Sequence, residues 1–389
     1  MANKDIMQFR KFGKTGWNAS ALGFGCMRLP TTDGAGMLTA NVDEDEAIRM
    51  IRHALDEGVN YVDTAYTYHL GASEVVLGKA LKDGYRDKVK LVTKSPTWAL
   101  QEASDYDKYL NEQLERLQAD RIDFYLFHGL GTERWKNMID RGILPRAEAA
   151  VSDGRVGRLG FSFHDNVDAF KTIVDGYDDW AMCLIQHNYM DIENQAGTEG
   201  LRYAASKGLA VVLMEPLLGG NLAKPPPAVR ALFDEFEVQR TPADWALQWL
   251  WNQPEVSLVL SGMSSMEQVD KNLRSADASR VGSLDPSELA FIDRVREKFR
   301  ERAVIPCTAC GYCVPCPNDV NIPAFIELYN EGVIYDDWGA PRFKYARMFG
   351  DSPRAEACLN CGECEEKCPQ SIEIGEWMPK VHEALKWRD

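Results

Sequence analysis

The segment EDEAIRMIRHALDEGVNYVDT, residues 44–64, decides the interpretation of the chain because it contains one complete helix-to-strand unit. Apolar residues fall on one helical stripe, acidic residues crowd the start, and Gly58 stands where a left-handed residue would end the helix. The stripe consists of Ala47, Ile48, Met50, Ile51, Ala54 and Leu55. A short apolar run follows at once, so the segment predicts a helix that leads directly into a buried parallel strand.

The same alternation of short apolar runs and amphipathic stretches extends from about residue 19 to residue 263. Candidate strands centre on residues 21–25, 61–64, 89–94, 123–128, 159–163, 182–188, 210–215 and 257–261. Eight parallel βα units close into a barrel, which typically takes about 250 residues. The sequence therefore predicts an α/β fold of the (β/α)8 TIM-barrel type.

The end of the barrel domain is marked by Asp285-Pro286-Ser287-Glu288. This spacing predicts a helix with an N-capping aspartate, a proline in the first turn and a glutamate that reaches back. The helix is expected to end near Arg302, and a cysteine-rich region begins after Pro306. We therefore predict two domains, a barrel at residues 1–303 and a small domain at residues 304–389.

Eight of the 10 cysteines lie close together in the C-terminal region, which indicates a metal site in a reducing compartment. The first run reads CxxCxxCxxCP and the second reads CxxCxxCxxxCP, the bacterial ferredoxin pattern. They consist of Cys307, Cys310, Cys313 and Cys316, and of Cys358, Cys361, Cys364 and Cys368. The runs predict two [4Fe–4S] clusters.

In such runs the cysteine before proline ligates the other cluster. One cluster is therefore expected on Cys307, Cys310, Cys313 and Cys368, and the other on Cys358, Cys361, Cys364 and Cys316. The first run has two residues before its last cysteine instead of the usual three, so Cys316 is the least secure ligand. A pair of zinc sites, each with four cysteine ligands, is the alternative.

The residues outside these runs complete the description of the cysteine region. Phe325, Ile326, Leu328 and Tyr329 recur at helical spacing and predict a ferredoxin-like domain of the α-helical type. The two remaining cysteines, Cys26 and Cys183, lie in or near predicted strands, where they are expected to be small core residues.

Ionisable residues fall at the carboxyl ends of three successive predicted strands, where barrel enzymes build their chemistry. They are Asp63 and Tyr68, Lys94, and His128. Each residue alone has a structural interpretation, as a cap, a packing group or a buried histidine. Together, and in this order along the chain, they are candidate catalytic residues. Trp98 and Trp135, in the loops that follow, are candidates for the pocket wall or for packing.

Residues 62–68, VDTAYTY, with Ser73-Glu74 further on, resemble the aldo/keto reductase family. The similarity spans about residues 7–275 and includes LVTK at residues 91–94 and DFYLFH at residues 123–128. The closest resemblance is to the branch that carries a C-terminal two-[4Fe–4S] ferredoxin-like domain. It rests on YHLG at residues 68–71 and CTACGYC at residues 307–313.

The resemblance implies that Tyr68 is the general acid that protonates a carbonyl oxygen. A neighbouring Lys94 would favour the phenolate, Asp63 would hold Lys94, and His128 would orient the substrate oxygen. Tyr66 competes for the acid role, but an offset of five residues from Asp63 favours Tyr68.

The resemblance further implies that NAD(P)H binds at Ser162, Gln186 and Asn272, which could equally be ordinary polar groups of a barrel. The chain departs from the family at three other nucleotide positions. Phe163 replaces an asparagine, Met214 an aromatic residue that would stack, and Gln268 an arginine. The sequence thus supports no preference between NADP and NAD. A flavin is a further candidate cofactor that no motif indicates.

Charge and hydropathy restrict the partners. Lys and Arg total 44 against 59 Asp and Glu, and a net charge of −15 disfavours nucleic acid and anionic membranes. No apolar run approaches the roughly 20 residues of a membrane span, and residues 1–5 lack the apolar core of a signal peptide. A cytoplasmic enzyme with a small-molecule substrate, with or without a redox partner protein, is expected.

Three functions remain open from the sequence. The first is an oxidoreductase that acts on a carbonyl, hydroxyl or related group in the barrel while the clusters move single electrons to or from the site or a partner. The second is an NAD(P)H-dependent carbonyl reductase whose clusters only stabilise the small domain. The third is an electron-transfer subunit in which the barrel site is vestigial.

Overall fold

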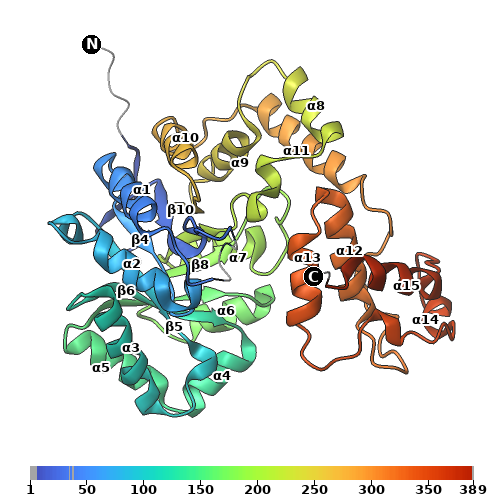
Figure 1. Cartoon of the computed structure of the whole chain (residues 1–389), viewed down its shortest axis with the longest axis horizontal. Coiled ribbons are helices and arrows are strands. Elements are labelled where there is room, and N and C mark those ends of the chain that lie inside the picture. Colours follow the sequence, from blue (N-terminus) through green and yellow to red (C-terminus); the bar gives the residue numbers. More distant parts are fainter. Residues whose placement is uncertain (1–6, 35, 37–38, 388–389) are drawn as a thin grey trace. The chain divides into compact units, whose positions relative to one another are not determined.

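The computed structural model describes residues 7–34, 36 and 39–387, and it contains the predicted barrel. Eight parallel strands close in the order β10-β3-β4-β5-β6-β7-β8-β9 (Figure 1). They are β3 (Leu22–Gly25), β4 (Tyr61–Asp63), β5 (Lys90–Ser95), β6 (Ile122–Leu130), β7 (Val156–Phe163), β8 (Met182–Gln186), β9 (Ala210–Met214) and β10 (Val256–Gly262). All eight predicted strands and the fold class are confirmed.

Helices connect the strands and surround the barrel, as Figure 1 shows for α1 to α7. They are α1 (Glu44–Asp56), α2 (Ala72–Ala80), α3 (Ala103–Leu117), α4 (Thr132–Asp140), α5 (Ile143–Ser152), α6 (Val167–Asp175), α7 (Gly197–Ser206), α9 (Pro242–Trp251) and α10 (Met266–Asp277). In α1, Asp43 caps the first turn by accepting the Glu46 N–H at 3.2 Å, and Gly58 adopts the expected positive φ of 101°. The helix-to-strand unit of residues 44–64 is therefore confirmed.

A hairpin of β1 (Phe9–Lys11) and β2 (Asn18–Ser20), which the sequence analysis missed, precedes the barrel. Its turn carries Phe12, which is fully buried among residues of the barrel interior. The Phe12 ring lies 5.9 Å from that of Tyr61 and 5.0 Å from that of Phe124, near the amino ends of β4 and β6. The hairpin therefore packs against the amino end of the barrel, opposite the carboxyl ends of the strands, where barrel enzymes build their sites.

The helix α11 (Pro286–Arg300) follows the barrel and begins as predicted. Asp285 accepts the Glu288 N–H at 3.0 Å, and the Glu288 carboxylate accepts the Asp285 N–H at 3.0 Å. By internal contacts the chain divides into two compact units, Met1–Gly219 with Ala243–Leu289 and Gly220–Pro242 with Ala290–Asp389. The helix α8 (Pro227–Glu235) and most of α11 thus pack with the C-terminal unit, while the domain boundary at residue 303 stays a prediction.

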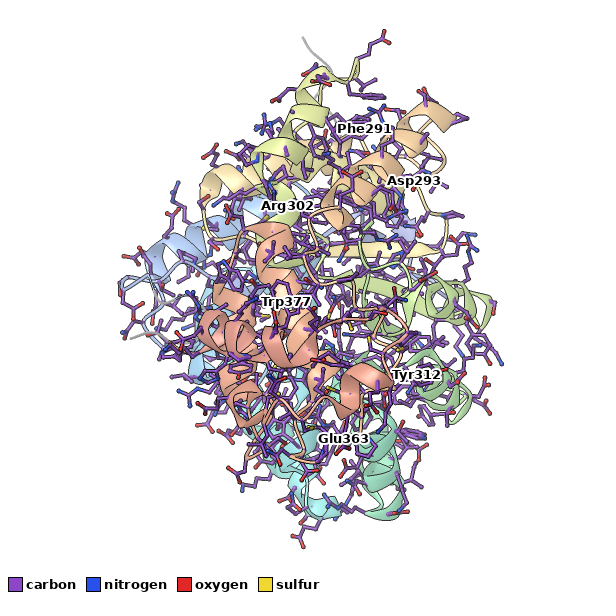
Figure 2. All side chains as sticks on the ribbon, turned by 90° about the vertical axis from the view of Figure 1, so that its right-hand side faces the viewer. Phe291, Asp293, Arg302, Tyr312, Glu363 and Trp377 are labelled. Carbon is purple, nitrogen blue, oxygen red and sulfur yellow. The ribbon has the colours of Figure 1, made fainter. Side chains whose placement is uncertain are left out.

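The C-terminal unit is helical and has its own core. Its helices after α11 are α12 (Ile322–Tyr335), α13 (Gly339–Arg347), α14 (Glu363–Glu366) and α15 (Ile374–Leu385). Phe325, Ile326, Met378 and Val381 are almost fully buried in this core. Figure 2 shows Trp377 on these helices, where its ring lies 5.7 Å from that of Tyr329. The predicted α-helical character is confirmed, and no described helix is long and apolar enough to cross a bilayer.

Candidate active site and cysteine cavities

The barrel brings the four candidate catalytic residues together at the carboxyl ends of β4, β5 and β6. The Lys94 ammonium donates to the Asp63 carboxylate at 2.5 Å, to the Thr64 carbonyl at 2.7 Å and to the Tyr68 hydroxyl at 3.3 Å. The rings of Tyr68 and His128 lie 6.0 Å apart and nearly perpendicular. The Tyr68 hydroxyl thus lies close to both the Lys94 ammonium and the His128 imidazole. This arrangement is able to protonate a substrate oxygen.

Burial controls the protonation states of this group. Lys94 and Asp63 are each 1% exposed. Burial lowers the pKa of Lys94, but Asp63 and Tyr68 together outweigh that effect and raise the pKa overall, so Lys94 is a cation. Burial raises the pKa of Tyr68 above its usual value, and Lys94 only partly offsets this increase. Tyr68 is therefore a neutral phenol at physiological pH. Lys94 does favour the phenolate, as expected, but the effect of burial on the pKa of Tyr68 is larger.

His128 is neutral for a similar reason. Burial holds its pKa well below the usual value, and Lys94, His164 and Arg134 lower it further. Within the part of the chain that the structure describes, its Nδ1 atom is buried without a hydrogen-bond partner. A neutral imidazole retains one N–H, which is what a donor to a substrate oxygen requires.

A buried polar network lies behind Lys94 and was not recognised from the sequence, although Glu74 was noted as part of a pattern. Glu74 is fully buried and accepts hydrogen bonds from Thr93 at 2.7 Å and from Gln113 at 2.5 Å. Arg116 pairs with the same carboxylate at 3.2 Å. Gln113 also donates to the Lys94 carbonyl at 3.2 Å, so this network fixes the backbone that carries the Lys94 cation.

The chain is strained just after Tyr68. His69, Leu70 and Gly71 adopt positive φ values of 51°, 54° and 95° in succession. A non-glycine residue in this region costs about 1–3 kcal/mol and persists only where its surroundings hold it. The buried His69 hydrogen bonds through Nδ1 to the Thr39 carbonyl at 3.2 Å, which anchors this turn.

The competitor Tyr66 is engaged elsewhere. Its hydroxyl donates to the Glu112 carboxylate at 3.1 Å, and the Arg116 guanidinium lies over its ring at 4.4 Å. Tyr68 contacts Lys94 and Tyr66 does not, so the geometry favours Tyr68 as the acid.

The three candidate nucleotide-binding residues also lie near the carboxyl ends of strands, each with a partner in the protein. Ser162 on β7 accepts the Gly129 N–H at 2.7 Å, and Gln186 on β8 donates to Asp191 at 2.7 Å. Asn272 in α10 donates to Ser261 at 3.0 Å. These bonds are compatible with both interpretations given above.

The positions that depart from the family pattern are explained by local packing. Phe163 is fully buried with its ring 5.0 Å from that of Phe170, so a polar residue there would be desolvated. Gln268 accepts the Ser264 N–H at 2.8 Å in the first turn of α10. Met214 ends β9, and the next residue, Glu215, has a φ of 53° and lies 3.6 Å from Arg28.

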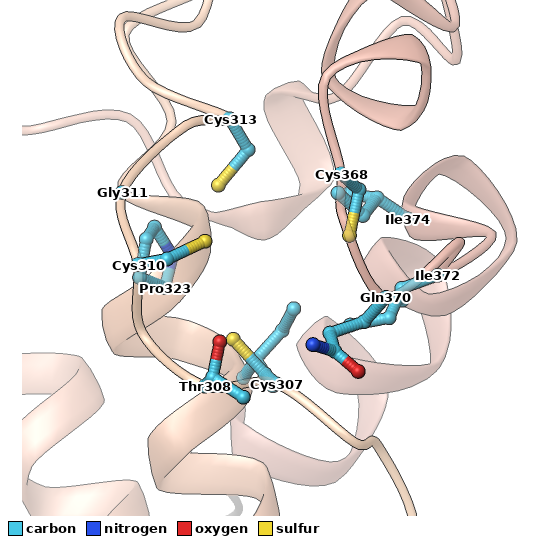
Figure 3. A pocket seen from close by; sticks show the side chains of 11 residues that line it. Cys307, Thr308, Cys310, Gly311, Cys313, Pro323, Cys368, Gln370, Ile372 and Ile374 are labelled. Atoms are coloured by element: carbon cyan, nitrogen blue, oxygen red, sulfur yellow. The ribbon is translucent and has the colours of Figure 1, made fainter.

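In the C-terminal unit, the eight clustered cysteines line two cavities, and each cavity takes cysteines from both runs. Figure 3 shows Cys307, Cys310, Cys313 and Cys368 with their sulfur atoms pointing toward one cavity of about 330 Å³. Cys368 comes from the second run and joins three thiols of the first. Apolar side chains, including Ile326, Ile372 and Ile374, complete the wall.

The second cavity, of about 600 Å³, is lined by the remaining members of both runs and by Cys313, which borders both cavities. The remaining members are Cys316, Cys358, Cys361 and Cys364. Among the described residues, no three His, Cys, Asp or Glu side chains converge closely enough to hold a single metal ion. Zinc requires Zn–S distances of about 2.3 Å, so wide rings of thiols fit multi-iron clusters better than zinc. Cys26 and Cys183 are fully buried in the barrel.

A parallel barrel with an acid and cation at its carboxyl end, joined to a helical unit with two thiol-lined cavities, defines a class of oxidoreductase. The family model described as "Aldo/keto reductase family" matches residues 21–297, and the one described as "4Fe-4S dicluster domain" matches residues 306–373. The chain therefore belongs to the aldo/keto reductase family and carries a C-terminal iron–sulfur domain, as expected.

Individual relatives are similar over the barrel-sized part of the chain. L-galactose dehydrogenase of Arabidopsis thaliana is 26% identical over 313 residues, which cover 76% of this chain and 96% of that protein. The holo form of aldo-keto reductase AKR11C1 from Bacillus halodurans is 26% identical, with a TM-score of 0.62 and coverage of 74% and 96%. An aldo-keto reductase from Klebsiella pneumoniae in complex with NADPH has the same fold, with 22% identity, a TM-score of 0.60 and coverage of 75% and 95%.

Proposed function

We propose that this protein reduces, or in reverse oxidises, a carbonyl or hydroxyl group of a small molecule at the carboxyl end of its barrel. The observation that carries the proposal is the buried chain of contacts from Asp63 through Lys94 to the Tyr68 hydroxyl. In reduction the carbonyl carbon accepts a hydride, which is two electrons and one proton, and the Tyr68 phenol gives its proton to the oxygen. The resulting phenolate lies beside the Lys94 cation, which stabilises the charge that develops.

The other two residues would position these groups. Asp63 holds Lys94 in place and keeps it charged, because its carboxylate lies 2.5 Å from the ammonium. His128 is neutral and would donate an N–H to the substrate oxygen, which orients the carbonyl toward Tyr68.

A bound nicotinamide would supply the hydride, and Ser162, Gln186 and Asn272 are the residues that we assign to it. Ser162 and Gln186 lie at or near the carboxyl ends of their strands and Asn272 bonds to Ser261 on β10, which fits such a role, and a relative of the same fold is described in complex with NADPH. The Glu215 carboxylate in the neighbouring loop would repel the additional phosphate that distinguishes NADP from NAD. We therefore assign no preference for NADP over NAD. A flavin remains the alternative that no residue pattern indicates.

The eight clustered cysteines would hold two [4Fe–4S] clusters with crossed ligation, one in each cavity, and these would supply one-electron transfer to or from the barrel site or a partner protein. The donor set fits, because at least four cysteines line each cavity and Cys368 and Cys316 each lie with cysteines of the other run. A hydride carries two electrons, so two one-electron centres together match one turnover.

The first test is anaerobic purification with iron and sulfide quantitation, followed by addition of NADPH or NADH while cluster absorbance and EPR are recorded. About eight irons per chain and reduction of the clusters would support electron exchange between the two halves. Clusters that are reduced by dithionite but by neither nucleotide would exclude nicotinamide as their donor. If the clusters accept electrons from no physiological donor, their role is structural.

The second test is Tyr68→Phe, which removes only the acid. General acid catalysis contributes about 10²–10⁴-fold, so turnover should fall by that factor while iron content and cluster absorbance stay unchanged. Unchanged turnover would refute the assignment of Tyr68. Tight binding of NADPH or NADH by the wild type would count against an electron-transfer subunit with a vestigial barrel site.

A further inference from the structure

The cations at the mouth of the barrel differ in their partners. Lys94 is paired with Asp63 at 2.5 Å, and Arg28 is paired with Glu215 at 3.6 Å. Arg134, in the first turn of α4, forms no ion pair with any residue that the structure describes. His128 is neutral because burial and the surrounding cations hold its pKa well below the usual value. Among these described groups, the guanidinium of Arg134 is therefore the cation that no carboxylate neutralises by direct contact.

Arg134 is held beside the candidate catalytic residues. Its Nη1 atom donates to the Gly129 carbonyl at 2.6 Å, and Gly129 directly follows His128 on β6. A Cβ atom at Gly129 would lie 2.7 Å from the same nitrogen, and this glycine has a φ of 63°. The absent side chain is what allows the guanidinium to lie against the strand end. A glycine at this position therefore has a steric reason as well as a conformational one.

Trp98 connects Arg134 to the reaction point. The guanidinium carbon lies 5.8 Å from the centre of the Trp98 ring, and that ring lies 5.1 Å from the His128 ring. Trp98 is 44% exposed, which leaves part of its face open to a ligand. The other candidate, Trp135, instead packs with its ring 6.0 Å from that of the buried Trp180. Trp98 is thus the aromatic residue that borders the mouth.

The acids in this region leave Arg134 available to a ligand. Asp165 is engaged by Thr132, whose N–H and hydroxyl donate to its carboxylate at 2.8 Å and 2.9 Å. Glu215 accepts the Gly219 N–H at 2.6 Å in addition to its pair with Arg28. An arginine has five N–H donors, and the bond to Gly129 uses one of them. The remaining donors can form a two-bond contact with a planar anion.

We propose that Arg134 is an anion subsite and that the substrate is a carbonyl compound bearing one carboxylate. This inference rests on the proposed function and names its substrate class. The carboxylate pairs with Arg134, the connecting atoms lie along Trp98, and the carbonyl reaches Tyr68 and His128. The planar guanidinium matches a carboxylate in a two-bond contact, and a single arginine suits a monoanion better than a phosphate dianion. The carboxylate is chemically unchanged, while the carbonyl carbon accepts the hydride and Tyr68 supplies the proton.

The test compares 4-carboxybenzaldehyde with methyl 4-formylbenzoate, which lacks the charge. Turnover is measured anaerobically on the holoenzyme with NADPH, NADH or reduced methyl viologen, for the wild type, Arg134→Gln and Arg134→Lys. A hydrogen bond to a charged group contributes about 1.5–3 kcal/mol, so kcat/KM for the acid should fall at least about 10-fold in Arg134→Gln. The value for the ester should change less than about twofold, and Arg134→Lys should be intermediate because it keeps the charge without the fork.

A matched control and a binding measurement make the result decisive. Lys136→Gln removes a cation from the same helix, where Lys136 pairs with Asp140 and is largely exposed, and it should leave both probes unaffected. Calorimetric binding of 4-(hydroxymethyl)benzoate should weaken in Arg134→Gln and persist in Tyr68→Phe. Equal losses for acid and ester, no preference in the wild type, or no measurable binding of this carboxylate by the wild type would overturn the subsite. Normal turnover in Tyr68→Phe would instead refute the proposed function and leave the binding result standing.

Discussion

The Asp63–Lys94 pair allows a prediction in which stability and activity separate. Both side chains are 1% exposed, and Lys94 donates to Asp63, Thr64 and Tyr68. Lys94→Met removes the cation and leaves the Asp63 carboxylate buried without its partner. Breaking a buried pair in this way costs about 3–5 kcal/mol, whereas replacing both members by apolar groups of similar size is often neutral. Lys94→Met should therefore be strongly destabilised, and Lys94→Met with Asp63→Leu should recover most of that loss.

The assay is differential scanning calorimetry of the anaerobically purified protein, with the barrel transition compared among the variants. A loss of 1 kcal/mol lowers Tm by about 2–4 °C in domains of 150–250 residues, so Lys94→Met should unfold about 6–20 °C lower. The double variant should unfold within a few degrees of the wild type and yet remain inactive, because Tyr68 has lost the cation that stabilises its phenolate. Wild-type stability of Lys94→Met, or activity in the stable double variant, would refute the role given to this pair.

Further predictions concern pH and the clusters. Because burial raises the pKa of Tyr68 and reduction needs the protonated phenol, the rate of the chemical step in reduction should be constant through neutral pH and fall only above about pH 10. Oxidation needs the phenolate, so its rate should instead increase as the pH rises. A reduction rate that already decreases with rising pH before pH 9 is reached would contradict the assignment. If ligation is crossed, Cys368→Ser and Cys307→Ser should lose the same EPR signal, and Cys358→Ser should lose the other signal. If Cys368→Ser and Cys358→Ser lose the same signal, each run of cysteines instead ligates its own cluster.

The sequence by itself determined the elements and the types of chemistry. Strand and helix periodicities are local properties, so the eight strands, α1 and the cap of α11 could be predicted from short segments. The cysteine spacing likewise indicated the cluster type, because two-residue gaps are set within one loop. The rule that barrel enzymes build their sites at the carboxyl ends of strands places Asp63, Tyr68, Lys94 and His128 in one region from the sequence alone.

Only the tertiary structure decided which of these side chains touch and how they are charged. Tyr66 and Tyr68 are two residues apart in the chain, yet one contacts Glu112 on α3 and the other contacts Lys94 on β5. The N-terminal hairpin, the network around Glu74 and the left-handed turn at His69 were missed because each depends on partners distant in the chain.

The unpaired Arg134 was missed for the same physical reason. Its place in the proposal depends on its lack of an ion pair with any described residue and on the space left by Gly129, and neither property is written in local sequence. The pKa of Tyr68 likewise depends on burial, which opposes the nearby Lys94 cation. Helices, strands and cluster type can be predicted from periodicity and spacing, because these depend on neighbours along the chain. Ion pairing and desolvation depend on the surroundings that a side chain acquires only in the folded protein.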